Sequence, residues 1–181
     1  MKLTGSVRQF ILHWGEMGTR WGVNRTVAQV HALLYLSPEP LTAEDIAETL
    51  SVARSNVSTS LKELQNWNLV HTDSRIGDRR DYFHTSSDVW TLFMTVVEQR
   101  VEREIVPTLT VLRRCAIEIQ AERPPQPTVA ARITAMQTFF DELHNWYTQI
   151  KRLPPASLHS LIGIGTGITR ILPKVRRRRL D

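Results

Sequence analysis

The chain has 181 residues, one cysteine and a formal net charge of +5. This length is sufficient for one domain with a hydrophobic core. The single cysteine excludes a disulfide within the chain and fits a reducing compartment. No signal peptide is evident, and the apolar stretch at residues 161–169 is too short to span a bilayer, so we expect a cytoplasmic protein.

The positive charge is concentrated near the C-terminus. Lys174 and the run at residues 176–179 supply five positive charges, of which Asp181 offsets one. A positive chain suits a polyanionic partner, but residues 53–84 hold five basic and four acidic side chains. A prediction of DNA binding must therefore rest on the arrangement of residues and not on bulk charge.

Two amphipathic helices are predicted first, at residues 6–17 and 26–36. Their apolar positions recur at helical spacing, with Val7, Phe10, Ile11 and Trp14 in the first helix and Val27, Val30, Leu33 and Leu34 in the second. We expect these side chains to face the core.

A helix-turn-helix is predicted at residues 41–66. Thr42 is a good N-cap, and Asp45 lies three residues later, where a capping box places its acid. Residues 51 and 52 form the turn, and the second helix starts near residue 53 or 54. The residues expected to anchor this helix to the core recur at helical spacing: Val57, Leu61 and Leu64.

The opposite face of the second helix is short and polar. Five of the seven residues at positions 55–61 are Ser, Thr or Asn, which are poor helix formers. Contacts to base edges and phosphates explain why such residues would stand there, because Asn pairs with adenine and Ser or Thr bonds to bases or phosphates.

A β-hairpin with a basic tip is predicted next. Residues 69–72 and 81–84 are strand-like, and Gly77-Asp78 between them is a turn signal. Arg75, Arg79 and Arg80 cluster at the tip. The alternative is a hairpin loop that only faces solvent.

A helix-turn-helix followed by a basic hairpin fits duplex DNA, with the second helix in the major groove and the hairpin tip at the backbone or minor groove. The candidate DNA-contacting residues are Thr42, Arg54, Ser55, Asn56, Ser58, Thr59, Lys62, Arg75, Asp78, Arg79 and Arg80.

Residues 41–83 resemble the winged helix of MarR-type transcriptional regulators. Asp78-Arg79-Arg80 matches the Asp-x-Arg wing signature of that family, which implies that the Asp braces an Arg that enters the minor groove. Residues 10–18, 20–29 and 32–38 resemble the GbsR branch of the family, so the likeness covers roughly residues 8–115, and the C-terminal third is looser. The resemblance implies a homodimeric repressor; some members of that family sense choline and control glycine betaine genes.

Helices are also predicted in the C-terminal half. In residues 88–122, Leu92, Val96, Ile105, Leu109, Leu112, Ala116 and Ile119 recur at three- and four-residue steps. Pro107 should kink or divide this stretch. After a proline-rich linker at residues 123–127, a helix at residues 129–151 carries Ile133, Met136, Phe139, Phe140, Leu143, Trp146 and Ile150. A last segment is predicted at residues 157–172.

The expected fold is mainly α, a winged helix-turn-helix with a small β-hairpin wing between N- and C-terminal dimerisation helices. Residues 20–86, with the helix at residues 6–18, form the DNA-binding domain, and residues 87–181 form a helical dimerisation or regulatory region with a basic tail. In MarR-like proteins such flanking helices interlock; the alternative is that they pack only within one chain.

Five aromatic residues are candidates for binding an effector: Trp14, Trp21, Tyr35, Trp90 and Phe93. A cage of such rings binds quaternary ammonium by cation–π attraction, which would match choline. The alternative is an ordinary aromatic core.

Other motifs are weaker. Residues 163–167 resemble a phosphate loop but lack a preceding strand and a following Lys-Ser or Lys-Thr. This segment and the arginine run favour a docking helix with a basic tail over contact with a membrane. Cys115 fits inert packing better than redox sensing. His13 and Glu16 are one turn apart but fit a core or interface role better than a metal site.

The sequence therefore predicts a dimeric, sequence-specific and ligand-responsive repressor that binds a near-palindromic operator. We expect no catalytic residues, metal or cofactor. The alternative is a winged-helix adaptor that binds a protein or a membrane surface without reading DNA.

Overall fold

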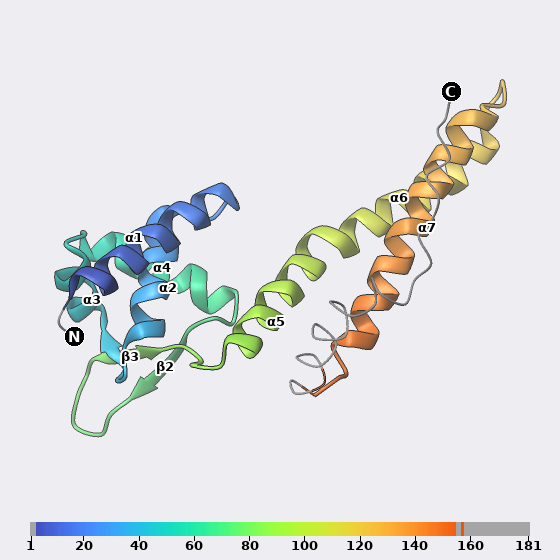
Figure 1. Cartoon of the computed structure of the whole chain (residues 1–181). Coiled ribbons are helices and arrows are strands. Elements are labelled where there is room, and N and C mark those ends of the chain that lie inside the picture. The colour runs from blue at the N-terminus through green and yellow to red at the C-terminus, as the bar shows by residue number, and fades with distance from the viewer. Residues whose placement is uncertain (1–2, 155–156, 158–181) are drawn as a thin grey trace, which may run out of the picture. The chain divides into compact units, whose positions relative to one another are not determined.

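A computed structural model of the chain describes residues 3–154 and 157. The chain divides into two compact units, Met1–Gln99 and Arg100–Asp181 (Figure 1). The predicted mainly helical winged-helix fold is confirmed. The glycine-rich and arginine-rich segments discussed above lie outside the described residues. Within the described ranges, no helix has both the length and the apolar character needed to cross a membrane.

The first unit opens with two antiparallel helices, α1 (Gly5–Arg20) and α2 (Arg25–Leu36). Side chains of Thr4 and Asn24 cap their N-termini. The helices approach closely because Gly18 has no side chain, and a Cβ atom there would lie 2.6 Å from the Cβ atom of Ala28.

The helix-turn-helix consists of α3 (Ala43–Leu50) and α4 (Arg54–Asn66). The predicted capping box is present, because Thr42 and Asp45 each accept a hydrogen bond from the backbone N–H of the other. Ser51 takes a left-handed conformation with φ of 55° and ends α3. The chain then enters α4 one or two residues later, as the sequence predicted.

A three-stranded antiparallel sheet forms the wing. Its strand order is β1 (Leu41–Thr42), β3 (Asp81–His84) and β2 (His71–Ser74). Strand β3 pairs Phe83 with both Leu41 and Thr72. Gly77 turns the loop between β2 and β3 with φ of 83°, a conformation that favours glycine.

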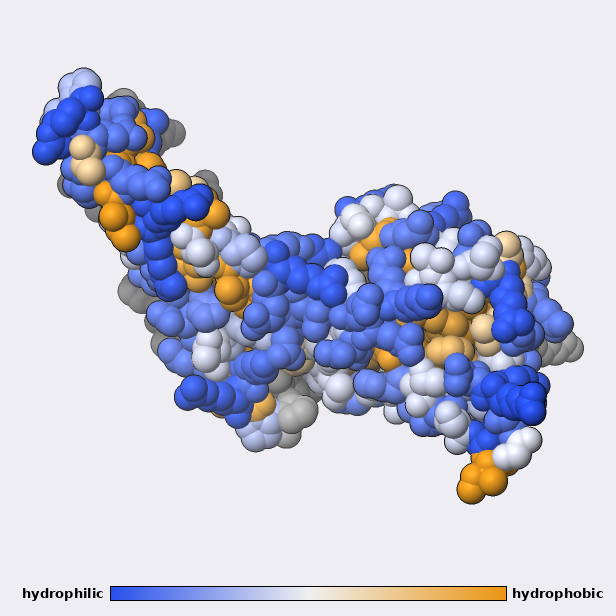
Figure 2. All heavy atoms as spheres, turned by 180° about the vertical axis from the view of Figure 1, so that it is seen from behind, coloured by the Kyte–Doolittle hydropathy of each residue, from blue (hydrophilic) through white to orange (hydrophobic). Residues whose placement is uncertain are grey.

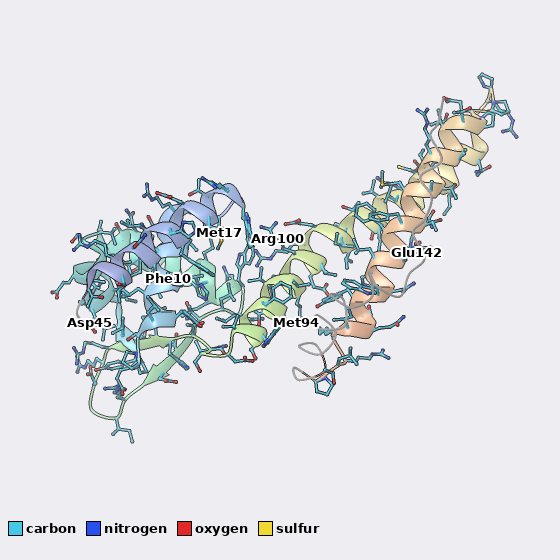
Figure 3. All side chains as sticks on the ribbon, in the orientation of Figure 1. Phe10, Met17, Asp45, Met94, Arg100 and Glu142 are labelled. Atoms are coloured by element: carbon cyan, nitrogen blue, oxygen red, sulfur yellow. The ribbon has the colours of Figure 1, made fainter. Side chains whose placement is uncertain are left out.

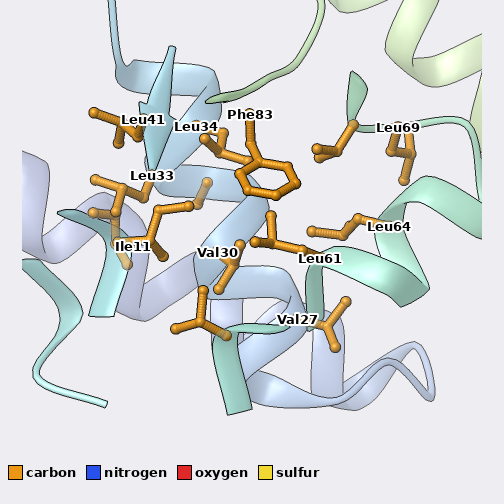
Figure 4. Close-up of a cluster of buried hydrophobic side chains, with 14 residues drawn as sticks. Ile11, Val27, Val30, Leu33, Leu34, Leu41, Leu61, Leu64, Leu69 and Phe83 are labelled. Atoms are coloured by element: carbon orange, nitrogen blue, oxygen red, sulfur yellow. The ribbon is translucent and has the colours of Figure 1, made fainter. Parts of the chain in front are cut away.

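The core of the first unit gathers the inner faces of α1, α2 and α4 around Phe83 of the sheet (Figure 4). Val57, Leu61 and Leu64 are buried in it, which confirms the predicted inner face of α4. Leu92 and Val96 of α5 (Val89–Arg100) also pack against this core. The first unit therefore extends past the domain boundary expected at residue 86.

The second unit begins with a π-helical segment, Val101–Ile105, followed by α6 (Val106–Ala121) and α7 (Pro127–Ile150). Pro107 lies in the first turn of α6, where its missing N–H costs no helical hydrogen bond. The predicted division of the long helix at Pro107 is confirmed. α6 and α7 pack side by side (Figure 1), and Arg113 bonds Asp141 across them at 2.5 Å.

We predict that Gly18→Ala destabilises the first unit by about 1–3 kcal/mol, because the new methyl group has no space against Ala28. Urea unfolding followed by circular dichroism would measure the change. Gly5→Ala is the matched control, since nothing lies within 4 Å of a Cβ atom at that position. Equal stability of the two variants would contradict the close packing of α1 on α2.

Candidate nucleic-acid interface

The outer face of α4 is a continuous polar surface. Burial of Val57, Leu61 and Leu64 turns the remaining side chains of the helix toward solvent. The residues predicted to contact DNA from this helix are all exposed: Arg54, Ser55, Asn56, Ser58, Thr59 and Lys62. Two of them already have partners within the chain, because Arg54 pairs with Glu44 and the Thr59 hydroxyl donates to the Ser55 carbonyl at 3.1 Å.

A groove of about 350 Å³ separates α4 from the wing. Ser58 and Lys62 line it from the helix, and Arg79 and Arg80 line it from the wing. Ser55, Asn56 and Thr59 do not line the groove and lie on the more open part of α4. The structure thus brings the predicted arginines of the wing and the polar face of α4 onto one surface.

Asp78 holds Arg80 in a fixed position at the wing. The Arg80 Nε donates to both oxygens of Asp78 at 3.0 and 3.1 Å, and its Nη2 donates to Oδ2 at 2.6 Å. The backbone N–H of Arg80 donates to the same carboxylate at 3.0 Å. These hydrogen bonds hold the pKa of the Asp78 carboxyl well below its usual range and raise the pKa of Arg80, so the pair is charged at neutral pH.

Tyr82 connects this pair to a second arginine and was not among the predicted site residues. Its hydroxyl donates to Asp78 at 2.7 Å and accepts from Arg80 at 3.0 Å. The Arg75 guanidinium lies over the Tyr82 ring, 3.9 Å from its centroid. The two-residue period of a strand, which puts positions 80 and 82 on one face, was the available signal for this contact.

Thr42 requires a correction among the predicted DNA contacts. Its side chain is only 1% exposed, and its hydroxyl donates to Asp45 at 2.6 Å. Thr42 therefore starts α3 and cannot reach a partner with its side chain. Its capping role explains the residue fully.

A second feature of the first unit is an apolar cavity of about 340 Å³ among residues of α1, α2 and α5. Four of the five predicted effector residues line it: Trp14, Trp21, Tyr35 and Phe93. The fifth, Trp90, does not, and instead packs edge-on against Phe93 with ring centroids 6.3 Å apart. Phe10 and Met17, which the sequence did not indicate for this site, lie on α1 and also line the cavity (Figure 3).

His31 is the polar side chain of this cavity and was also missed. It lies on α2, is 8% exposed and has no hydrogen-bond partner for its Nε2 among the described residues. Burial lowers the pKa of His31 to about 4, so its ring is neutral at physiological pH. The sequence placed position 31 between core residues of α2 and gave no separate signal for it.

The remaining motifs show no built site. His13 and Glu16 are exposed, and no cluster of three metal-ligating side chains occurs in the described ranges. Cys115 is half-buried on α6.

Comparisons with known proteins agree with this geometry. Residues 21–81 match the model of the MarR family. The winged helix of this chain is of the MarR type. Two proteins of Bacillus subtilis (strain 168) are similar: the HTH-type transcriptional repressor GbsR, 25% identical over 100 residues, and the putative HTH-type transcriptional regulator YvaV, 23% identical over 87 residues. The predicted resemblance to the GbsR branch is confirmed, and these relatives are transcription regulators, not enzymes.

The similarity has limits in coverage. The match takes in 55% of this chain and 55% of GbsR, and 48% of this chain and 49% of YvaV. The chain thus spans about half the length of the curated relatives that it matches. A crystal structure of a transcriptional regulator aligns with a TM-score of 0.65 over 80% of this chain and 95% of that protein, at 18% identity, and so supports the fold of the MarR-type winged helix.

We predict that His31 makes the protein less stable in mild acid. Below pH 6.5 the unfolded chain binds a proton that the folded chain rejects until pH 4, so this stability is complete above pH 6.5 and falls as the pH drops. The loss should be about 2 kcal/mol at pH 5. Urea unfolding of wild type and His31→Leu at pH 7 and pH 5 would isolate it; an identical pH dependence in both proteins would refute a buried neutral His31.

Proposed function

We propose that this protein is a homodimeric transcriptional regulator of the MarR type, acting as a repressor that binds a near-palindromic DNA operator. The observation that carries the proposal is the shared surface of the α4 polar face and the wing arginines. In this arrangement α4 enters the major groove, and the wing arginines contact the backbone or the minor groove. Two copies would then bind half-sites about one helical turn, roughly 34 Å, apart.

The chemistry of α4 favours sequence readout over nonspecific attraction. Its N-terminal half presents amide and hydroxyl groups, of which Asn56 is suited to a bidentate contact with adenine. A surface built only for phosphates would carry lysine and arginine at these positions. The adaptor alternative, in which the winged helix binds protein or membrane, accounts less well for exposed residues that weaken the helix.

We predict that Asn56→Ala lowers affinity for the operator by about 1–3 kcal/mol and changes affinity for random DNA little. Gel shift or fluorescence anisotropy against DNA from upstream of the protein's own gene would measure both. Asn66→Ala, the same change at the C-terminal end of α4, is the control and should leave both affinities near wild type. An equal loss on both DNAs would mean that Asn56 only positions the helix, and failure of the wild type to bind would favour the adaptor.

The wing contributes a positioned charge. We predict that Asp78→Ala weakens DNA binding roughly two- to ten-fold, although it removes a negative charge, because Arg80 must then be ordered on binding. Asp81→Ala removes the same charge from an exposed position of β3 and should not weaken binding. Titrations at several salt concentrations would compare the variants; tighter binding by Asp78→Ala would show that charge repulsion governs the wing.

We propose that the second unit and α1 form the dimer interface. Several large apolar side chains of α6 and α7 are exposed, among them Ile117 at 74%, Phe139 at 56% and Trp146 at 61%. Figure 2 shows apolar side chains along the helices of this unit. Exposed apolar area of this kind marks a surface that another protein covers, and in a regulator of this type that protein is a second copy.

We predict a dimer at micromolar concentration in analytical ultracentrifugation, and a shift to monomer for Phe139→Glu because a charge cannot be buried unpaired at the interface. Thr134→Glu is the control, since residue 134 is exposed and lies about 140° around α7 from residue 139. A monomeric wild type that binds DNA with unchanged affinity would rule out this interface.

We further propose that a small ligand in the apolar cavity controls DNA binding. Its aromatic walls fit a quaternary ammonium group such as that of choline, which rings attract through cation–π contacts. Phe10 stacks on Trp14 and Tyr35, with centroids 5.4 and 6.4 Å away, so part of this wall is already formed. The ligand shifts the protein only if it binds the released geometry better than the DNA-bound one.

A further inference from the structure

The cavity between α1, α2 and α5 is selective in the charge that it can hold. Among the residues that line it, only His31 and Tyr35 have titratable side chains, and none is Asp, Glu, Lys or Arg. A ligand carboxylate placed there would leave water without a cation beside it, and an unpaired buried charge is strongly unfavourable. The rings can compensate a diffuse cation but not an anion, because their faces are negative.

His31 supplies the one hydrogen-bonding position that the protein leaves unused. Most buried polar atoms in folded proteins have partners, and leaving one without a partner destabilises the fold. The His31 Nε2 is such an atom in the described residues, and the residue lines the cavity. An apolar side chain on this face of α2 would avoid that cost, so a partner from outside the chain explains why histidine stands there.

We propose that His31 is the polar anchor of the cavity, which takes a small hydroxyl-bearing molecule without negative charge and with an apolar or quaternary ammonium body. A hydroxyl both donates and accepts, so it satisfies Nε2 in either neutral tautomer of the ring. The rest of the ligand lies against the walls formed by Trp14, Trp21 and Phe93. This assignment deepens the proposed ligand response by naming the chemistry that the site recognises.

Direct binding to the DNA-free protein tests the anchor. The probes are choline and benzyl alcohol, which carry the hydroxyl on a cationic and on a neutral body, and benzoate, which puts a carboxylate on the same ring as benzyl alcohol. Quenching of tryptophan fluorescence follows binding, because Trp14 and Trp21 line the cavity. We expect at least one hydroxyl probe to bind and benzoate to bind roughly ten-fold or more weakly; the stronger of the two hydroxyl probes identifies the body that the walls prefer.

Two substitutions separate anchoring from folding. His31→Leu keeps the volume apolar and should weaken the hydroxyl probe about ten-fold while raising the melting temperature of the free protein. His31→Gln keeps a hydrogen-bonding group and should retain most of the affinity. Unchanged probe binding in His31→Leu, benzoate binding as tight as benzyl alcohol, or no binding of either hydroxyl probe to the wild type would overturn the proposal.

Operator binding by the same proteins keeps the two proposals distinguishable. Ligand-free His31→Leu should bind DNA like the wild type, since His31 lies outside the α4 and wing surface. A wild type that binds the hydroxyl probe but no DNA would reject the regulator and retain the anchor. A wild type that binds DNA but neither probe would do the reverse.

Discussion

The burial of one face of α4 determines most of what this protein presents to a partner. Val57, Leu61 and Leu64 are locked into the core beside α2, which fixes the rotation of the helix about its own axis. The short polar side chains at positions 55, 56, 58 and 59 must then face outward. Their low helix propensity is tolerated because tertiary packing, and not propensity, stabilises the helix.

The wing depends on a different kind of constraint, because its arginines are exposed. A surface ion pair such as Asp78–Arg80 adds little to the stability of the fold. Its contribution is geometric: Asp78 and Tyr82 hold Arg80 and Arg75 in place before a partner arrives. A side chain that is already ordered loses less entropy on binding, so these contacts favour affinity without favouring folding.

The sequence predicted those features that arise within one element or from adjacent positions. The capping box at Thr42 and Asp45 and the inner face of α4 follow from local spacing, and both are present. The contributions of Tyr82 and His31 depend on which elements meet in three dimensions, and no local pattern marks them. Trp90 failed for a related reason: neighbouring helical positions differ by about 100°, so aromatic composition alone could not place its ring relative to the cavity.

The second unit shows why the proposed dimer and its fold are coupled. In its described residues the buried apolar side chains are Val101, Leu109, Ile119 and Tyr147, a small number for two helices of 16 and 24 residues. Helices in water derive most of their stability from burying an apolar face. The exposed side chains of α6 and α7 supply such a face once a second copy covers it. Under the proposed function, one association would then stabilise the helical hairpin and pair the two DNA-reading surfaces, so a ligand that weakens either would be felt by both.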